Sequence, residues 1–343
     1  MRVALVGATG AVGSIMLKVL EERRFPATEV VPFASERSVG RRLPFAGREI
    51  EVRALTEEGI RGFDVAIFSA GGSTSGEWAP RFAAAGAVVV DNSSRWRMED
   101  DVPLVVSEVN PDDLDSHRGI IANPNCSTMQ MVVALKPIDV VAGIERLVIT
   151  TMQSVSGTGQ KAVEELRDQT EAALAAREVP AAQAYAHQIA FNVLPHAGTF
   201  PEGSDYTDEE LKLVNETRKI LGKPDIAVSA TCTRVPVYTG HSESVNVQTR
   251  ESLSADDCRA LLGRSPGLTV LDDPPNAVYP LAIDAAGRDD VLVGRIRQDP
   301  SHPRALNLFV VADNLRKGAA TNAVQLAELL VERGLVGARP QAA

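Results

Sequence analysis

A glycine-rich turn near the start of this chain limits its possible folds more than any other feature. Residues 2–6 form a short apolar run typical of a strand, and Gly7-Ala8-Thr9-Gly10-Ala11-Val12-Gly13 follows it directly. Apolar residues then recur at helical spacing over 11–23. Glycines allow a tight turn close to a pyrophosphate, and the amides at a helix N-terminus attract anions. A tight connection without a ligand would have the same pattern, but the flanking strand and helix favour nucleotide binding.

The alternation of strand and helix continues through the first third of the chain. Strands are expected at 30–34, 65–69 and 87–90, with a helix at 75–85 between the last two. Strands that alternate with helices predict a parallel, doubly wound sheet of the α/β class.

The pattern changes after residue 126. A longer strand is expected at 147–152, and alternating apolar residues at 245–249 indicate a sheet with one covered face. A helix is expected over 205–221, where Thr207 and Glu210 have capping-box spacing. Another is expected over 319–333, and residues 337–343 are expected to be disordered.

Size and composition narrow the class of protein. A chain of 343 residues exceeds one hydrophobic core, so two domains are expected. Acidic residues outnumber basic ones by 45 to 35, which argues against a nucleic-acid footprint. The three cysteines have neither disulfide nor metal-site spacing. No signal peptide or membrane span is evident, so we expect a cytoplasmic protein without membrane or metal partners.

The residues after the second expected strand bear on the choice between NAD and NADP. Ser35, Arg37 and Ser38 suit a 2′-phosphate, whereas the acidic Glu36 suits a free 2′-hydroxyl. The sequence therefore favours NADP, with Glu36 as the discordant residue.

Cys126 lies in Asn123-Pro124-Asn125-Cys126-Ser127-Thr128, just before a helical stretch at 127–136. Asn125 is a favoured N-cap, and a helix N-terminus lowers a thiol pKa and so increases its thiolate fraction. Cys126 could instead be a small buried hydrophobe. An exposed thiolate beside a nicotinamide would favour covalent catalysis through a thioester.

Such chemistry requires an acid/base group. His241 follows a strand-like stretch at 234–238 and a glycine, which would place its imidazole at a loop tip. By itself a histidine on a loop is more often a solvated surface residue.

Four motifs span nearly the whole chain: Gly7 to Gly13, Asn123 to Thr128, Gln153-Ser154-Val155-Ser156-Gly157-Thr158-Gly159, and Arg234-Val235-Pro236-Val237 leading to Gly240-His241-Ser242. Together, and in this order, they resemble the motifs of one enzyme family, that of aspartate-semialdehyde dehydrogenase. The resemblance implies reversible conversion of L-aspartyl 4-phosphate and NADPH to L-aspartate 4-semialdehyde, phosphate and NADP, toward lysine, threonine and methionine. It also implies that Cys126 is the nucleophile, that His241 is the acid/base, and that Gln153 orients the acyl intermediate.

The same resemblance assigns the substrate contacts. Arg234 matches the family's carboxylate-binding arginine, and a guanidinium can hold a carboxylate bidentately. Glu216 and Lys219 match its E-x-x-K pair, which implies contacts with the substrate amine and phosphate. Without the resemblance this pair would be taken as a surface ion pair.

Arg97 corresponds to the family's phosphate-binding arginine. In an extended segment Arg95 would share its face, so geometry alone does not separate the two, and the following Met98 favours Arg97. Asn125, beside the nucleophile, is a further candidate phosphate contact.

The resemblance also defines a cofactor site and a domain plan. The expected NADP contacts are Gly7, Thr9, Gly10, Ala11, Val12, Ser35, Arg37, Ser38, Ser156, Gly157 and Asn314. The expected architecture is a Rossmann-type dinucleotide-binding domain of residues 1–125 plus 314–343, with a mixed-sheet α+β catalytic and dimerisation domain of residues 126–313. The implied assembly is a homodimer.

Three rivals remain open. A reductase of N-acetyl-glutamyl phosphate would share the architecture, but an acetylated amine needs no anionic partner, so Glu216 discriminates. A non-enzymatic NADP-binding protein would be expected to lack Cys126 or His241. A cysteine hydrolase leaves the glycine-rich turn unexplained.

Overall fold

The computed structural model describes residues 1–336, and the stretch expected to be disordered, 337–343, lies outside the described residues. The chain divides into two compact units. The first unit comprises Met1–Asn125 and the described residues from Ala319 onward, and the second comprises Cys126–Gly318. The chain thus returns to the first unit at Ala319, rather than at residue 314.

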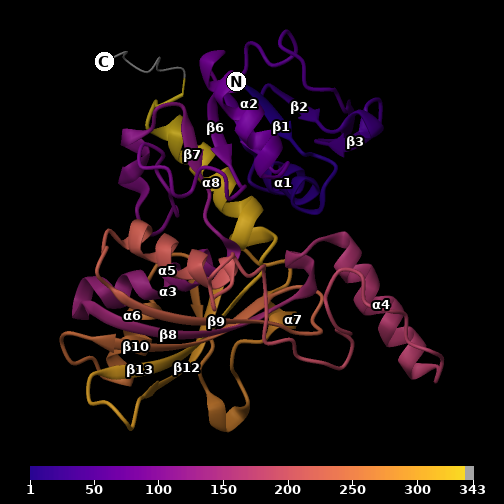
Figure 1. Ribbon diagram of the computed structural model, residues 1–343. Coiled ribbons are helices and arrows are strands. Elements are labelled where there is room, and N and C mark those ends of the chain that lie inside the picture. Colours follow the sequence, from indigo (N-terminus) through magenta and orange to yellow (C-terminus); the bar gives the residue numbers. More distant parts are fainter. Residues whose placement is uncertain (337–343) are drawn as a thin grey trace. The chain divides into compact units, whose positions relative to one another are not determined.

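The first unit is built on a parallel sheet of five strands in the order β2-β1-β5-β6-β7. These strands are β1 (Arg2–Val6), β2 (Glu29–Phe33), β5 (Val65–Phe68), β6 (Val88–Asp91) and β7 (Ile120–Ala122). The helices are α1 (Ala11–Glu22), α2 (Gly72–Ala84) and α8 (Asn322–Glu332), and a hairpin pairs β3 (Arg42–Phe45) with β4 (Arg48–Glu51). In Figure 1 the yellow α8 lies among the indigo and purple elements of this unit, as expected for a discontinuous unit.

Both faces of this sheet are covered. Val3 and Leu5 of β1 pack in a core with residues of α1 and α8, while the alternate residues, Ala4 and Val6, pack in a core with residues of α2. Leu5 is fully buried, and such burial contributes about 2 kcal/mol. The predicted parallel, doubly wound sheet is confirmed.

The second unit contains a mixed sheet of six strands in the order β11-β12-β13-β10-β8-β9. These strands are β8 (Ile144–Gln153), β9 (Ala227–Arg234), β10 (His241–Thr249), β11 (Leu268–Val270), β12 (Val291–Gln298) and β13 (Ala305–Ala312). Its α-helices are α3 (Cys126–Ala142), α4 (Gln160–Leu174), α5 (Asp208–Leu221), α6 (Ala255–Leu262) and α7 (Ala282–Ala285). The outer pairs β8–β9 and β11–β12 are parallel, and the inner pairs are antiparallel.

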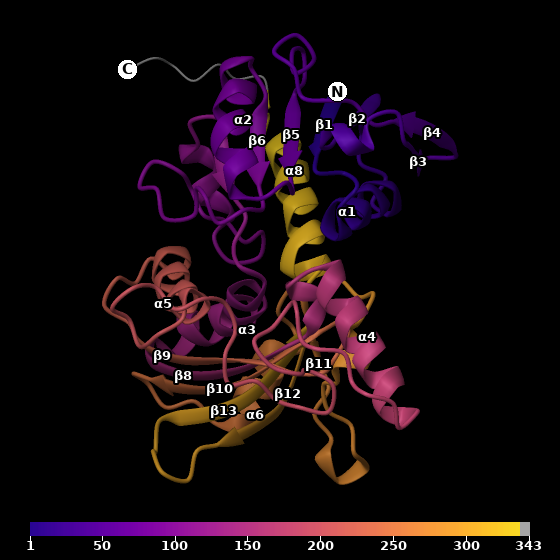
Figure 2. The ribbon, with the colours of Figure 1, turned by 45° about the vertical axis from the view of Figure 1, so that its right-hand side comes forward.

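One face of this sheet is covered by helices. In β10 the odd-numbered residues from His241 to Thr249 are buried, and the residues between them are half-buried or exposed. Helix α3 contacts β8 and β10, and α5 contacts β9. Figure 2 shows α3 and α5 on the same side of β8 and β9. The predicted covered face is therefore confirmed, as is the capping box of Thr207 and Glu210 at the start of α5.

Three local predictions were wrong. The stretch 234–238 is not a strand, because β9 ends at Arg234 and Pro236 lacks the amide that would continue the ladder. His241 is not at a loop tip either, because it is the first residue of β10 and pairs with Ala312 of β13. A π-helix at Arg316–Thr321 also precedes α8, where a regular helix from residue 319 was expected.

Candidate active site

The glycine-rich turn of the first unit has the tight backbone expected of an anion-binding loop. Gly7 has a φ of +87°, and a Cβ there would overlap the Ser69 carbonyl. A Cβ on Gly13 would overlap the Gly7 carbonyl. Gly10 caps α1 without any side-chain hydrogen bond, so the helix N-terminus at Ala11 is open to a ligand phosphate.

The end of β2 lies beside this turn. The amides of Gly7 and Ala8 donate to the Phe33 carbonyl at 2.8 and 3.2 Å. Ser35, which follows β2, caps a short 3₁₀ helix at Glu36–Ser38. Its residues Glu36 and Arg37 are exposed, and within residues 1–336 no ion pair engages either of them. The guanidinium of Arg37 and the hydroxyls of Ser35 and Ser38 are thus available to a ligand beside the turn.

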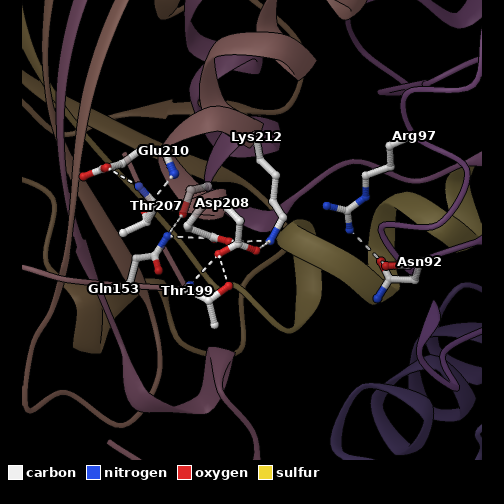
Figure 3. Close-up of polar contacts among 10 residues, drawn as sticks. Asn92, Arg97, Gln153, Thr199, Thr207, Asp208, Glu210 and Lys212 are labelled. Carbon is white, nitrogen blue, oxygen red and sulfur yellow. Dashed lines mark hydrogen bonds and ion pairs between the residues drawn. The ribbon is translucent and has the colours of Figure 1, made fainter. Parts of the chain in front are cut away.

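Arg97 and Arg95 have different surroundings. Arg97 is 8% exposed and donates from Nε to the Asn123 carbonyl at 3.0 Å. Its Nη2 donates to the Asn92 carbonyl, also at 3.0 Å (Figure 3). Arg95 is exposed, pairs with Glu99 at 2.5 Å and stacks on Trp96. The premise that the two share a face was wrong, because this segment is bent rather than extended. Arg97 therefore contacts the segment that leads to the nucleophile candidate.

Cys126 is the first residue of α3 and is partly exposed, and the preceding Asn125 is buried. Cys232 and Cys258 are buried instead. Burial raises the pKa of the Cys232 thiol, and it raises that of Cys258 to about 12. The small-hydrophobe interpretation thus fits Cys232 and Cys258, whereas Cys126 combines exposure with a helix N-terminus.

Gln153 ends β8 and is buried close to the start of α3. Its Nε2 donates to Ser127 Oγ at 2.7 Å and to Glu209 Oε1 at 3.1 Å. The side-chain amide is therefore fixed between the residue after Cys126 and the first turn of α5 (Figure 3).

Arg234 ends β9 as a buried cation. Its Nη1 donates to the Ser154 carbonyl at 2.8 Å, and its guanidinium lies 5.9 Å from the Tyr185 ring centroid. In the described part of the chain no carboxylate forms an ion pair with it, and its Nε has no hydrogen-bond partner. A buried, unpaired guanidinium is costly, so this arrangement suits an anionic ligand.

His241 is a buried imidazole with one engaged and one open nitrogen. Its Nδ1 accepts the Ser154 amide at 3.0 Å, which assigns the proton of the neutral ring to Nε2. Nε2 has no hydrogen-bond partner within residues 1–336. Burial, followed by the charge of Arg234, holds the pKa of His241 well below its ordinary value. The ring is therefore neutral and can donate from Nε2.

A polar network orients this histidine. The Ser154 hydroxyl lies 3.0 Å from His241 Nδ1 and 3.0 Å from Asn314 Oδ1. Asn314 Oδ1 also accepts the Gly240 amide at 3.0 Å, and its Nδ2 donates to Ser156 Oγ at 3.0 Å. Ser154 was not among the expected site residues, although it lies within the motif from Gln153 to Gly159. Asn314 and Ser156, expected as cofactor contacts, also support the histidine.

Gly157 leaves space beside this histidine. A Cβ there would lie 3.0 Å from His241 Nε2 and 3.2 Å from Arg234 Nη1. Because Gly157 has no side chain, space remains next to both His241 Nε2 and Arg234 Nη1.

Glu209 and Lys212 form a second E-x-x-K pair, which was not among the expected site residues. Lys212 pairs with Glu209 at 3.1 Å and with Asp208 at 2.6 Å (Figure 3). Burial lowers the pKa of Lys212, but the charges of Glu209 and Asp208 outweigh that effect and leave it raised. Of the expected pair, Glu216 is fully buried in α5 and Lys219 is half-buried. Gln153 donates to Glu209, which lies two turns before Glu216 on the same helix.

Comparison with known proteins identifies the family. Two family models match, the NAD binding domain of semialdehyde dehydrogenases over residues 2–117 and their dimerisation domain over residues 135–317. The chain is 58% identical over 338 residues to the aspartate-semialdehyde dehydrogenase of Aquifex aeolicus, covering 98% of this chain and 99% of that protein. It is 56% identical over 333 residues to that of Legionella pneumophila, covering 96% and 95%.

Solved structures agree with these matches. Aspartate semialdehyde dehydrogenase II from Vibrio cholerae superposes with a TM-score of 0.92 at 48% identity, covering 96% of this chain and 98% of that one. Its complex with ASA gives the same values. The Candida albicans enzyme with NADP gives a TM-score of 0.75 at 26% identity, covering 98% and 99%. The chain belongs to the aspartate-semialdehyde dehydrogenase family.

Proposed function

We propose that this protein reduces L-aspartyl 4-phosphate to L-aspartate 4-semialdehyde with NADPH, releases phosphate, and also catalyses the reverse reaction. The observation that carries the proposal is the open Nε2 of a neutral, buried His241 close to the unpaired Arg234. Both lie in the same unit as Cys126, at the start of α3. The product is a precursor of lysine, threonine and methionine, the role expected of the family.

Cys126 is the nucleophile of the proposed reaction. Its thiolate attacks the acyl carbon, the bond from that carbon to the phosphate oxygen breaks, and a thioester remains. When bound, the nicotinamide supplies the hydride that reduces this thioester. His241, the expected acid/base, donates a hydrogen bond from Nε2–H to the oxyanion of the resulting thiohemiacetal. That oxyanion collapses to the aldehyde as the carbon–sulfur bond breaks and Cys126 leaves as the thiolate. Gln153 holds the acyl group through its amide, which carries no charge.

Arg234 is the proposed partner of the substrate α-carboxylate, since a guanidinium can bind it bidentately. We assign the amine contact to Glu209 and the phosphate contact to Lys212, instead of Glu216 and Lys219. The bond from Gln153 to Glu209 supports this change, because it brings the first turn of α5 to the residue that holds the acyl group.

Arg97 and Asn125 are the proposed further phosphate contacts. Two backbone carbonyls fix the Arg97 guanidinium beside the segment that ends at Asn125. This placement supports Arg97 over Arg95, whose charge already pairs with Glu99.

NADP is the proposed cofactor. Gly7, Thr9, Gly10, Ala11 and Val12 would bind its pyrophosphate, since the helix N-terminus is open there. Ser35, Arg37 and Ser38 would bind its 2′-phosphate, and Ser156, Gly157 and Asn314 would lie at its nicotinamide end. Initial rates with NADP and NAD test this assignment, and Arg37→Ala should raise the KM for NADP but not for NAD.

A homodimer is the proposed assembly, supported by the match of the second unit to a dimerisation domain. Light scattering on the purified protein tests it, and a monomeric mass at working concentration would contradict it.

The experiment for the activity follows NADPH formation from aspartate semialdehyde, phosphate and NADP. The parent protein should be active and Cys126→Ala inactive. A parent that acts only on the N-acetyl-glutamyl substrate would favour the rival reductase. If the rival activity is present, Glu209→Gln should have little effect on it, because an acetylated amine needs no anionic partner. If the proposed activity is present, Glu209→Gln should raise the KM for aspartate semialdehyde.

A further inference from the structure

A buried acid, Glu243, lies next to His241 in the sheet. Glu243 follows His241 by two residues in β10, so both side chains point to the helix-covered face. Glu243 is fully buried, and within residues 1–336 neither of its carboxyl oxygens has a hydrogen-bond partner. No described lysine, arginine or histidine forms an ion pair with it. The mechanism proposed above does not use this residue.

The neighbours of Glu243 in the sheet are uncharged, with Val310 of β13 on one side and Thr151 of β8 on the other. Thr151 of β8 lies directly opposite Glu243, and Cys232 of β9 lies opposite Thr151. Gln130 of α3 faces the carboxyl from above the sheet. The Thr151 hydroxyl and the Gln130 Oε1 are also buried without partners in the described structure.

This environment determines the charge of Glu243. Burial raises its pKa well above the ordinary value, and the facing Gln130 amide lowers it only in part. The charged groups that act on the adjacent Cys232 are all acids, and each raises the pKa of its thiol. They are Glu209 and Glu210 of α5 and Glu243 itself. Glu243 is therefore a neutral acid with one proton to donate.

Gln130 connects this acid to the active site. It lies about one helical turn after Cys126 on α3. Its Nε2 donates to the backbone carbonyl of His241 at 3.2 Å. The Nε2 end of the Gln130 amide is thus hydrogen-bonded to the first residue of β10. The other end, Oε1, is a buried acceptor that needs a hydrogen-bond donor.

We propose that Glu243 is a positioning residue, which donates its proton to Gln130 Oε1 and thereby fixes the start of β10, with His241, against the nucleophile helix α3. Gln130 Nε2 completes the connection through the His241 carbonyl. This proposal rests on the proposed function, because it explains how His241 is positioned relative to Cys126.

Conservative and apolar replacements of Glu243 test the proposal. Glu243→Gln keeps a donor and an acceptor, so kcat, KM and the pH profile of kcat/KM should stay within about twofold of the parent. Glu243→Leu removes the donor, and kcat should fall about 10- to 100-fold with little change in KM, as expected for a misplaced acid/base. Its thermal stability should fall modestly, because Gln130 Oε1 is left buried without a donor, so kcat is measured well below the unfolding temperature.

Val245→Ala is the matched control, since Val245 is the next buried residue on the same face of β10. It should lower the thermal stability without lowering kcat. Gln130→Leu should match Glu243→Leu, and the double variant should be no slower than either single one. An unchanged kcat in Glu243→Leu would overturn the proposal, as would a shifted pH profile in Glu243→Gln, which would indicate a charged group.

Infrared spectroscopy makes the test independent of the reaction. The parent should have a protonated-carboxyl stretch at neutral pH that Glu243→Gln lacks, even if the protein does not act on aspartate semialdehyde. Absence of that band in an active protein would refute the neutral acid alone. Presence of the band in a protein without the activity would refute the proposed function alone.

Discussion

Replacement of Arg234 should separate stability from activity. Arg234 is 7% exposed and lacks a carboxylate partner among the described residues, and its Nη1 hydrogen bond goes to the Ser154 carbonyl. If it binds the substrate carboxylate, the empty enzyme carries a buried charge that only the ligand compensates. Arg234→Leu should therefore abolish substrate recognition without destabilising the fold.

The size of each effect follows from these contacts. Loss of the bond to Ser154 costs about 1.5–3 kcal/mol. Removal of the unpaired charge returns several kcal/mol, so the free energy of unfolding should be equal or higher by about 1–3 kcal/mol. Two charge-assisted bonds to the substrate, at about 1.5–3 kcal/mol each, predict a kcat/KM lower by about 100- to 10,000-fold.

Urea unfolding and steady-state rates with aspartate semialdehyde measure the two quantities on the same preparation. Arg234→Lys is the matched comparison, because it keeps the charge and loses the planar fork. Its kcat/KM should fall by about 10- to 100-fold. A kcat/KM for Arg234→Leu within about threefold of the parent would remove Arg234 from the substrate site.

The remaining predictions concern close packing and acid stability. Gly157→Ala should lower kcat about tenfold, because its Cβ would press on the His241 ring at 3.0 Å, and a normal kcat would show that this space is not needed. Gly318→Ala should also lower kcat, since its Cβ would lie 2.8 Å from Cys126 Cβ, and the alkylation rate of the thiol measures the displacement directly. His241 has a lowered pKa in the folded state, so the unfolded chain binds its proton first as the pH falls below about 6.5. The free energy of unfolding should then decrease by up to about 1.4 kcal/mol per pH unit, and His241→Gln should lessen that slope in urea titrations.

Much of the fold could be predicted because its signals are local. Residues 2–23 contain a strand, a turn and a helix in one stretch, and the structure places β1 and α1 there. The capping box at Thr207 is likewise a contact between near neighbours in the sequence. Alternation in β10 predicted its covered face correctly, because the period of a strand directly determines which residues share a face.

Parts of the site depend on contacts that spacing does not encode. Glu209 and Glu216 both begin an E-x-x-K pair on the same helix, and the contact of Glu209 with Gln153 favours the first pair. The support of His241 by Asn314 joins segments far apart in the sequence. The burial of His241 comes from strand pairing, which a single glycine turn does not indicate.

The central claim is that Cys126 forms a covalent acyl intermediate, and a single turnover tests it most directly. Protein mixed with L-aspartyl 4-phosphate in the absence of NADPH should release phosphate in a rapid burst of about one equivalent per active site. Mass spectrometry of the quenched protein should find the aspartyl group on the peptide that contains Cys126. A protein that turns over with NADPH, yet gives neither burst nor adduct without it, would contradict the account.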